Sequence, residues 1–379
     1  MDKPVEDLDA LIGELDSQVE PRVSEAIESV ELFHHWASLV VRHGASDLFL
    51  TTDARPMIRL NGALAPLSDH RLTAEEIEST ILPLLDPKAA AAYRAGGIID
   101  ASFRLPGVGR FRINLHRERR QPAAAVRVLP QSVPKLADLH LPHEVEQLST
   151  LTAGLVLIGG ATGAGKTTTM AALVDAINRR DPKHIITVED PIEFEHSNAV
   201  SLVEQIEIGV DAPDFPTALR AAVRQAPDVL VIGEMRDPES MRIALSAAET
   251  GHLVLSSVHT LDIGSTISRI CDSFPNERQN TIRQELSHAL AAVMTQFLMP
   301  CATGGRIPAA ELLILSYGAR QHIRKNNLQH LHQEITMTRK LGSLTLEESL
   351  AKLVRTGKIT AAEASLRSRH PDELEGLLK

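Results

Sequence analysis

The sequence predicts an α/β fold in which a smaller α+β domain precedes a larger, doubly wound domain with a parallel sheet. Two observations carry this prediction. Short strand patterns bounded by turn residues dominate residues 32–130, whereas long apolar strands alternate with long helical patterns over residues 143–315. The proline-bearing stretch 131–142 is expected to be a linker. Residues 316–379 are expected to form helices, and residues 1–31 an acidic extension.

The composition is typical of a globular protein with aliphatic cores. Of the 379 residues, 43% are hydrophobic but only 3% are aromatic. No run of about 18 apolar residues occurs, so no membrane-spanning helix is expected. The N-terminus lacks the basic and apolar regions of a secretory signal. The two cysteines, Cys271 and Cys301, have no partners at metal-ligand spacing, so a reducing cytoplasm is the expected compartment.

The net charge of −10 is concentrated at one end of the chain. Residues 1–31 contain ten acidic and two basic side chains, which leaves the remainder close to neutral. Nucleic-acid-binding proteins usually have a basic patch, and since no strong one is visible, no nucleic-acid partner is expected. Apolar residues from Leu8 to Val19 follow helical spacing, so this extension is either a solvated arm or a partner-binding helix.

The first domain is expected to begin with a helix at Ser24–His43, which Gly44 would terminate. Two further helices are expected at Thr73–Leu85 and Pro87–Tyr93. Five segments have strand patterns: Asp47–Leu50, Met57–Leu60 with an Asn61-Gly62 turn, Ala101–Leu105, Phe111–Leu115 and Ala123–Leu129.

In the second domain, continuous apolar strands alternate with helical patterns such as Thr167–Arg179 and Pro238–Glu249. Strands that are apolar on both faces are typical of a parallel sheet covered by helices on each side. Such sheets bind ligands beyond the C-terminal ends of their strands. The expected strands are Gly154–Gly159, Ile185–Val188, Val229–Ile232, Leu253–Val258 and Ala309–Leu315.

The strongest motif follows the first of these strands. The pattern GxxxxGK[ST] occurs between a strand and a helix, which is the context that a phosphate-binding loop requires. Glycines let the backbone wrap around phosphate oxygens, while loop N–H groups and the helix N-terminus attract the anion. Lys166 is expected to reach the β- and γ-phosphates of ATP, and the Thr167 hydroxyl to hold Mg²⁺. The expected nucleotide contacts are Gly160, Ala161, Thr162, Gly163, Ala164, Gly165, Lys166, Thr167 and Thr168.

Carboxylates end two further strands. Glu234 follows Val229–Ile232, an arrangement typical of the acid that polarises the attacking water or holds water bound to Mg²⁺. A second group of acids, from Glu189 to Glu193, follows Ile185–Val188. Because acids near a triphosphate repel it unless a cation intervenes, this group favours a bound Mg²⁺. The structural alternative is that these carboxylates cap helices or lie in surface turns.

Two histidines flank one strand. His252 precedes Leu253–Val258 and His259 follows it. In a phosphate-loop domain this placement favours a role in sensing phosphate or in coupling the site to a neighbour, although a histidine can also be purely structural.

These motifs together resemble the type IV pilus retraction ATPases, the PilT-like proteins of the secretion-ATPase superfamily. The resemblance covers about residues 32–370 and is carried by four motifs in order: GATGAGKTTT, ITVEDPIEFEH, VLVIGEMRDPESMRIALSAAETGHLVLSSVHT and ARQHIRK. It implies a PAS-like first domain and a RecA-like second domain. It also implies a ring of six chains, with ATP between the two domains near a subunit boundary.

The resemblance also implies roles for individual residues. Glu234 becomes the catalytic Walker B acid and Glu193 the key acid of the Asp box, while His252 and His259 become the His-box pair. The expected Mg²⁺ ligands are then Thr167, Glu193 and Glu234, partly through water. Arginines that reach phosphates across domain or subunit interfaces are expected because arginine stays charged and stabilises the transferring phosphoryl group. These arginines are Arg110, Arg112 and Arg127.

The implied function is a cytoplasmic motor, peripheral at the inner membrane, that hydrolyses ATP to ADP and phosphate to drive pilus retraction and twitching motility. The implied partners are copies of the same chain and a pilus inner-membrane platform protein, with a paralogous motor ATPase left open. The segment Ala319–Lys325 resembles the family segment tied to retraction. Two lone cysteines cannot form the four-cysteine zinc module usual in extension and type II secretion ATPases, which favours the retraction branch.

Three alternatives remain open at the level of sequence. They are a secretion-type assembly motor, a non-hydrolysing nucleotide-binding subunit that partners a motor, and a small-molecule kinase. Departures from the family pattern at Ile206, Ala226 and Lys325 keep the partner subunit open. The kinase lacks an evident acceptor site or lid, and the second large domain argues against it.

Overall fold

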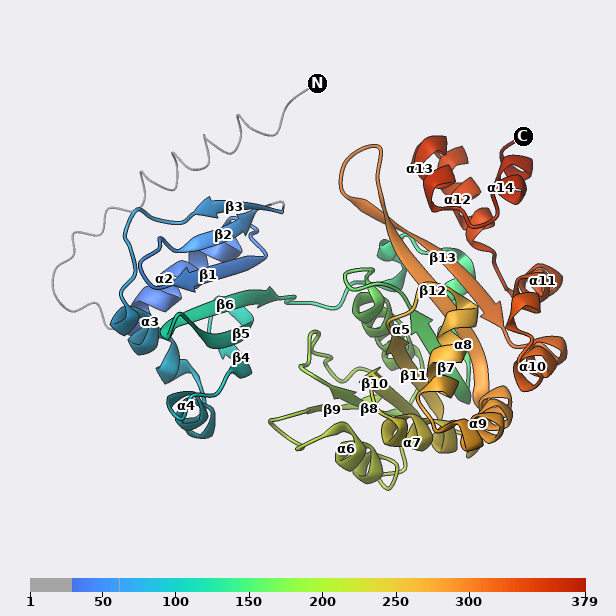
Figure 1. The fold of residues 1–379 in the computed structure, drawn as a ribbon, viewed down its shortest axis with the longest axis horizontal. Helices are drawn as coiled ribbons and strands as arrows, with labels where there is room; N and C mark the ends of the chain where they lie inside the picture. Colours follow the sequence, from blue (N-terminus) through green and yellow to red (C-terminus); the bar gives the residue numbers. More distant parts are fainter. Residues whose placement is uncertain (1–28, 61) are drawn as a thin grey trace. The chain divides into compact units, whose positions relative to one another are not determined.

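The computed structural model describes residues 29–60 and 62–379, and it divides the chain into two compact units, Met1–Gln131 and Ser132–Lys379 (Figure 1). Each unit is described by itself. The possible helix from Leu8 to Val19 and Asn61 of the expected turn lie outside the described residues, as does the expected start of the first helix at Ser24.

The first unit is built on a six-stranded antiparallel sheet with the order β3-β2-β1-β6-β5-β4. The five predicted strands are present, and a short strand, β3, completes the hairpin after β2. The strands are β1 (Asp47–Thr51), β2 (Met57–Leu60), β3 (Ala63–Pro66), β4 (Ile99–Leu105), β5 (Gly109–Glu118) and β6 (Gln121–Leu129).

Three helices pack on one face of this sheet. Helix α2 (Ser29–Arg42) buries Phe33 and Trp36, and the chain turns after it at Gly44, whose φ of +66° favours glycine. Helix α3 (Ala74–Ile81) begins at a Thr73 capping box, and α4 (Pro87–Arg94) follows. Because side chains alternate along β5, its apolar residues point to these helices, whereas Arg110 and Arg112 point to the other face.

The second unit contains a seven-stranded sheet with the order β13-β12-β7-β11-β10-β8-β9. All neighbouring strands are parallel except the β12–β13 pair, which confirms the predicted α/β class. The strands are β7 (Gly154–Gly159), β8 (His184–Glu189), β9 (Leu202–Glu207), β10 (Val229–Glu234), β11 (Leu253–Val258), β12 (Leu290–Pro300) and β13 (Arg306–Ile314).

Helices cover both faces of this sheet (Figure 1). Along β7, Leu155 and Leu157 pack towards one helical layer, whereas Val156 and Ile158 pack towards the other. The layer on the Leu155 side is formed by α6 (Phe215–Ala222), α7 (Pro238–Glu249), α8 (Ile263–Asp272) and α9 (Asn276–Ala289), and the opposite layer contains α5 (Lys166–Arg180). This two-sided burial explains why the strands are continuously apolar.

Residues at the start of the second unit are packed rather than extended. Leu136, in a short 3₁₀ helix, and Leu141 pack against the same core as α5. Part of the stretch that the prolines mark as a linker therefore packs against the second unit.

The C-terminal region is helical, as predicted. Its helices are α10 (Tyr317–Arg324), α11 (Leu331–Met337), α12 (Leu346–Arg355), α13 (Ala361–Arg367) and α14 (Pro371–Leu378). A separate apolar cluster joins α12, α13 and α14 to the β12–β13 hairpin through residues such as Phe297 and Leu350. No helix within residues 29–60 or 62–379 is long and apolar enough to cross a bilayer.

Candidate nucleotide site

The loop from Gly160 to Thr167 connects the end of β7 to the first turn of α5. Gly163 and Gly165 adopt positive φ angles of 77° and 87°, and Gly165 is the N-cap of α5. A Cβ atom at Gly160 would lie 2.8 Å from the carbonyl oxygen of Gln296. The glycines are therefore required by the path of the loop, which leads into the N-terminus of α5, where free backbone amides attract anions.

Lys166 lies against this loop. Its ammonium group donates hydrogen bonds to the carbonyl oxygens of Gly160, at 2.9 Å, and Ala161, at 3.0 Å. Burial lowers the pKa of Lys166, and the carboxylates of Glu234 and Glu193 oppose that change. The lysine charge is thus held at the loop and faces the two predicted acids.

Gln296 on β12 supports the loop from behind. Its amide nitrogen donates to the carbonyl oxygen of Ala164 at 2.7 Å, and its amide oxygen accepts from the Thr169 hydroxyl at 2.7 Å. The side chain is 2% exposed, so both bonds are shielded from water. Gln296 was not predicted from the sequence, because only the pairing of β12 with β7 brings it to the loop.

Glu234 lies at the end of β10, two strands from β7 in the sheet. One carboxylate oxygen contacts the guanidinium of Arg236, and the other lies 3.5 Å from Nε2 of His259. Nδ1 of His259 lies 3.5 Å from the Thr162 hydroxyl. Burial lowers the pKa of His259, and the charge of Lys166 adds to this effect. The structure therefore brings Glu234, His259 and the loop together at one edge of the sheet.

The second acidic group surrounds the end of β8. Oε1 of Glu189 accepts hydrogen bonds from the Thr187 hydroxyl, at 2.7 Å, and from the Gln205 amide, at 3.2 Å. Loss of hydration raises the pKa of Glu189 to about 7, and the neighbouring charge of Glu193 contributes to the increase. The backbone N–H of Glu193 donates a hydrogen bond to the Glu189 carboxylate, and the Glu193 side chain interacts electrostatically with Lys166.

His252 does not join this group. It precedes β11, at the opposite end of the strand from His259. Its Nδ1 lies 2.9 Å from the carbonyl oxygen of Ala247, and its own carbonyl accepts from Gly154. At about 3.3 Å per residue, the strand separates the two histidines by roughly 20 Å. Within one chain, His252 therefore joins the end of α7 to the start of β7 at the far edge of the sheet.

The three predicted arginines share the first unit's sheet face that is turned away from its helices. Arg112 and Arg127 lie directly opposite each other on β5 and β6. Arg127 donates to Asp47 at 2.9 Å while its side chain remains 65% exposed, and Arg112 lies 3.5 Å from Asp100. Arg110, in contrast, is largely buried. The exposed pair is thus better placed than Arg110 to meet a polyanion.

The segment Ala319–Lys325 covers most of α10 and its C-cap residue Lys325, and two of its arginines have a structural role. Arg320 donates to the carbonyl oxygens of Ser287 and His288, and Arg324 donates to the Ser287 hydroxyl at 2.8 Å. Ser287 and His288 lie in the last turn of α9, and the unpaired carbonyl groups at the end of a helix attract positive charge. The arginines therefore tie α10 to the C-terminus of α9.

The donors near the loop suit Mg²⁺ only in the presence of phosphates. Within the described parts of the chain, no three His, Cys, Asp or Glu side chains cluster closely enough to hold a metal ion. Mg²⁺ usually binds one or two protein groups and completes its shell with water and phosphate oxygens. The Thr167 hydroxyl at the start of α5, with Glu193 and Glu234 nearby, fits such a partial set.

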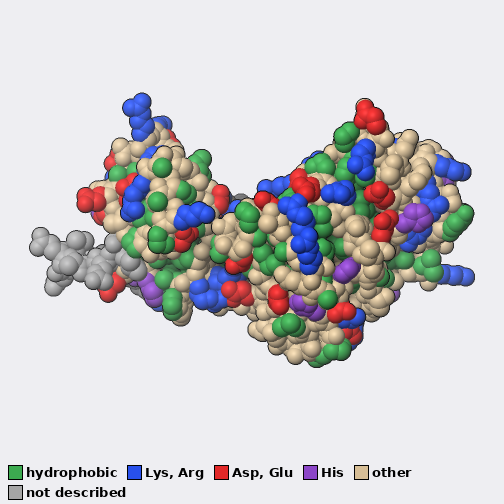
Figure 2. Space-filling model, turned by 90° about the horizontal axis from the view of Figure 1, so that it is seen from below, with side chains coloured by type: hydrophobic (Ala, Val, Ile, Leu, Met, Phe, Trp, Pro, Cys, Tyr) green, Lys and Arg blue, Asp and Glu red, His purple; other side chains and the backbone are tan. Residues whose placement is uncertain are grey.

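A glycine loop at the C-terminal edge of a parallel sheet, with an acid at the end of a strand close by, is the architecture of P-loop nucleotide-binding proteins, and this chain is one of them. Charges of both signs are interspersed on the face drawn in Figure 2, so that face has no extended basic field.

Comparison with known proteins identifies the family. The family model described as type II/IV secretion system protein matches residues 30–372. A twitching motility protein of Neisseria gonorrhoeae is 38% identical over 320 residues, which cover 84% of this chain and 86% of the relative. The type IV pilus retraction ATPase PilT of Pseudomonas aeruginosa is 37% identical over 331 residues, which cover 87% and 96%.

A crystal structure of the pilus retraction motor PilT with bound ADP is similar to this chain, with a TM-score of 0.83 and 40% sequence identity. The match covers 93% of this chain and 100% of that one. The chain belongs to the type II/IV secretion system protein family and is a PilT-like member of it. The resemblance predicted from the four motifs is therefore confirmed.

The raised pKa of Glu189 predicts a pH-dependent stability. The carboxyl is uncharged at lower pH in the folded protein, so its contribution is fully present below its ordinary pKa of 4.5 and is lost as the pH rises through about 7. Because a pKa unit corresponds to about 1.4 kcal/mol, the free energy of unfolding should fall by up to about 3 kcal/mol over this interval relative to Glu189→Gln. Urea denaturation of both proteins at pH 5 and pH 8 measures this difference. An equal change in the free energy of unfolding of the two proteins between pH 5 and pH 8 would contradict a raised pKa of Glu189.

Proposed function

We propose that the protein is a motor ATPase that hydrolyses ATP to ADP and phosphate and drives type IV pilus retraction. The observation that carries this proposal is the placement of Lys166, Glu234 and His259 around one glycine loop. Its PilT-like membership supports the choice of a pilus motor among the many uses of P-loop proteins.

ATP binding begins with an exchange of partners at the loop. The phosphates accept from the backbone amides of residues 160–168, and the Lys166 ammonium leaves the carbonyl oxygens of Gly160 and Ala161 for the β- and γ-phosphates. Because burial already disfavours the charged lysine, an anionic partner at this position is strongly favoured.

Glu234 is the proposed general base. Its carboxylate accepts a proton from the water that attacks the γ-phosphate, and its pairing with Arg236 must loosen for that step. His259 is close to Glu234 and to Thr162. In its neutral form, which its lowered pKa favours, this histidine positions the terminal phosphate. Mg²⁺, held by Thr167 and through water by Glu193 and Glu234, would neutralise charge on the phosphate oxygens.

The arginines of the first unit are the proposed clamp. Arg127 and Arg112 present guanidinium groups whose present partners, Asp47 and Asp100, are exchanged for phosphate oxygens when a ring closes around ATP. Arg110 is proposed to support them from its buried position on the same strand. ATP drives such closure only through its higher affinity for the closed state. His252 is proposed to act at a subunit boundary, because it lies far from the loop of its own chain.

A ring of six copies would couple successive hydrolysis events to work on a pilus inner-membrane platform protein. The motor is proposed to lie in the cytoplasm at the inner membrane, and a paralogous motor ATPase is a further proposed partner. A non-hydrolysing partner subunit is the second candidate function, and one specific observation favours it: Glu234 is paired with Arg236, which would restrain a general base.

Two substitutions test hydrolysis. Lys166→Ala removes the phosphate contact and Glu234→Gln removes the base, so each should lower kcat by about a hundredfold or more. The matched controls are Lys352→Ala and Glu249→Gln, which replace exposed side chains away from the loop and should leave turnover unchanged. Phosphate release from ATP measures the effect. Turnover close to wild type in either site variant would refute the assignment, and ATP binding without turnover in the wild type would establish the partner subunit.

Retraction is tested in cells. Deletion of the gene, complemented with Lys166→Ala, should leave cells with excess surface pili and no twitching, because pili are assembled but not withdrawn. Complementation with the wild-type gene should restore both properties. Loss of surface pili in the deletion strain would instead indicate an assembly motor.

A further inference from the structure

Four strands contribute one residue each to a row that crosses the sheet at the base of the glycine loop. Glu311 of β13 pairs with Thr295 of β12. Thr295 pairs in turn with Gly159 of β7, the residue before the loop, and Gly159 pairs with Val258 of β11. Because His259 directly follows Val258, the row connects the β12–β13 hairpin to the histidine that is proposed to position the terminal phosphate.

The row is tightly packed at Gly159. A Cβ atom at this position would lie 2.9 Å from the Thr260 hydroxyl oxygen, 3.0 Å from the Thr295 methyl carbon and 3.1 Å from the Thr266 hydroxyl oxygen. The hydroxyls of Thr260 and Thr266 lie 2.7 Å apart, and Thr266 donates to the carbonyl oxygen of Asp262 at 2.7 Å. The segment that follows β11 therefore packs directly on the base of the glycine loop, where α8 supports it from one side.

The His259 ring is weakly restrained by its own contacts. It lies 3.5 Å from the Glu234 carboxylate and 3.5 Å from the Thr162 hydroxyl, and its side chain is 47% exposed. Contacts of this length are at the limit of a hydrogen bond and add little restraint. The position of the ring therefore depends on the backbone that carries it, residues 259–262.

Arg369, between α13 and α14, holds this backbone from the other side. Its guanidinium donates to the carbonyl oxygen of Leu261 and, at 2.9 Å, to the carboxylate of the buried Glu311. The Thr295 hydroxyl donates to the same carboxylate oxygen at 3.3 Å. Because the arginine fork presents several donors in fixed directions, one side chain can join β13 to the segment after β11.

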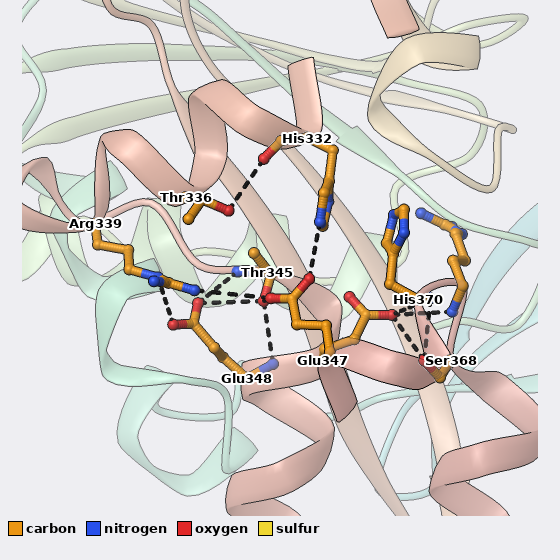
Figure 3. Close-up of polar contacts among 10 residues, drawn as sticks. His332, Thr336, Arg339, Thr345, Glu347, Glu348, Ser368 and His370 are labelled. Carbon is orange, nitrogen blue, oxygen red and sulfur yellow. Dashed lines mark hydrogen bonds and ion pairs between the residues drawn. The ribbon is translucent and has the colours of Figure 1, made fainter. Parts of the chain in front are cut away.

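Arg369 is itself held in place by the C-terminal helices. The fully buried Glu347 on α12 accepts hydrogen bonds from the backbone amides of Arg369 and His370, at 2.9 Å and 3.0 Å, and from the Ser368 hydroxyl at 2.9 Å. The His370 ring stacks on His332 of α11, and Figure 3 shows Glu347, Ser368 and His370 in this arrangement. The guanidinium therefore extends from a braced backbone.

We propose that Arg369 is a positioning residue for ATP hydrolysis, which acts through His259 by fixing residues 259–262 against Glu311. The proposal rests on the proposed ATPase function and adds a residue of the C-terminal region to the groups that place the terminal phosphate. Because Arg369 acts on the backbone of this segment, its loss should slow hydrolysis and leave nucleotide affinity unchanged.

Substitution of Arg369 separates hydrolysis from binding. Arg369→Ala removes both contacts and should lower kcat by about tenfold, because small displacements of a positioning group slow the chemical step. The Kd for ADP should stay within about twofold of wild type, since the glycine loop is intact. Arg369→Lys keeps the charge beside Glu311 but lacks the fork, so its kcat should lie between those of wild type and Arg369→Ala.

The matched control is Arg339→Ala, which removes an arginine that pairs with Glu348 at 2.6 Å within the same C-terminal helices (Figure 3). It should leave kcat and the Kd for ADP unchanged. Phosphate release and isothermal titration calorimetry on the full chain measure the two quantities, and thermal melts identify the folded variants.

A second substitution tests whether the effect passes through His259. When Arg369→Ala is introduced into a His259→Ala protein, the rate should change by less than about twofold, because the group that Arg369 positions is already absent. A general structural role would lower the rate by the same factor in both backgrounds. Single-turnover hydrolysis at high enzyme concentration gives the rates of these slow variants. If Arg369→Ala does not fold, Arg369→Lys takes its place in both backgrounds.

The outcomes distinguish this inference from the function on which it rests. Wild-type protein that does not turn over ATP would overturn the proposed function and the inference with it. If the wild type is active, three results would overturn the inference alone: an unchanged kcat on substitution of Arg369, an equal loss in both backgrounds, or a rise in the Kd for ADP that matches the loss of kcat. The assignment of the glycine loop would then stand.

Discussion

The site depends on a tightly wound stretch of backbone that is held in place from behind. The loop after β7 is wound so tightly that its carbonyls need hydrogen-bond donors and its crowded face has no room for side chains. Gln296 meets the first need by donating to Ala164, and Gly160 and Gly165 meet the second because a Cβ atom at either would clash with Gln296. The loop, the first turn of α5 and β12 therefore form one unit, and each would lose its geometry without the others.

From this unit the rest of the site divides along the sheet. The β10–β11 side carries Glu234 and His259, which face the charge of Lys166 on the loop and are groups for phosphate chemistry. The β12–β13 side carries a pocket with an arginine–aromatic stack and helices from the C-terminal region. Arg369 reaches from the second side towards the first through Glu311 and the carbonyl of Leu261. In a motor, a change of bound nucleotide must alter the structure far from the site. These contacts form a continuous physical link from the sheet edge that carries the glycine loop to the C-terminal helices.

Features that are contiguous in sequence were predictable, and features assembled by strand pairing were not. The glycine loop and Glu234 each follow an apolar strand, so their place at one edge follows from parallel strands alone. Strand β12 continues directly from α9 without a turn residue, and its apolar run does not distinguish helix from strand, so it was not predicted. The role of Gln296 depends on β12 and was missed with it.

The histidine pair illustrates the same limit. Both residues flank β11, and a motif taken as a unit suggests that both act together, yet a strand of six residues puts its two ends on opposite edges of the sheet. His259 joins Glu234, whereas His252 lies at the far edge. Likewise, the prolines before the second unit predicted a linker through residue 142 but gave no sign that Leu136 and Leu141 are half-buried against the α5 layer. In each case the residue types were recognised and the long-range packing was not.

The central claim is that the backbone amides of residues 160–168 hold the phosphates of the nucleotide. Amide hydrogen exchange on the full chain, with and without ADP, tests this claim directly. Exchange should slow at these residues on addition of ADP, and the protection should be lost in Lys166→Ala at the same ADP concentration. Protection confined to other segments, with the loop amides unchanged by saturating ADP, would contradict the account.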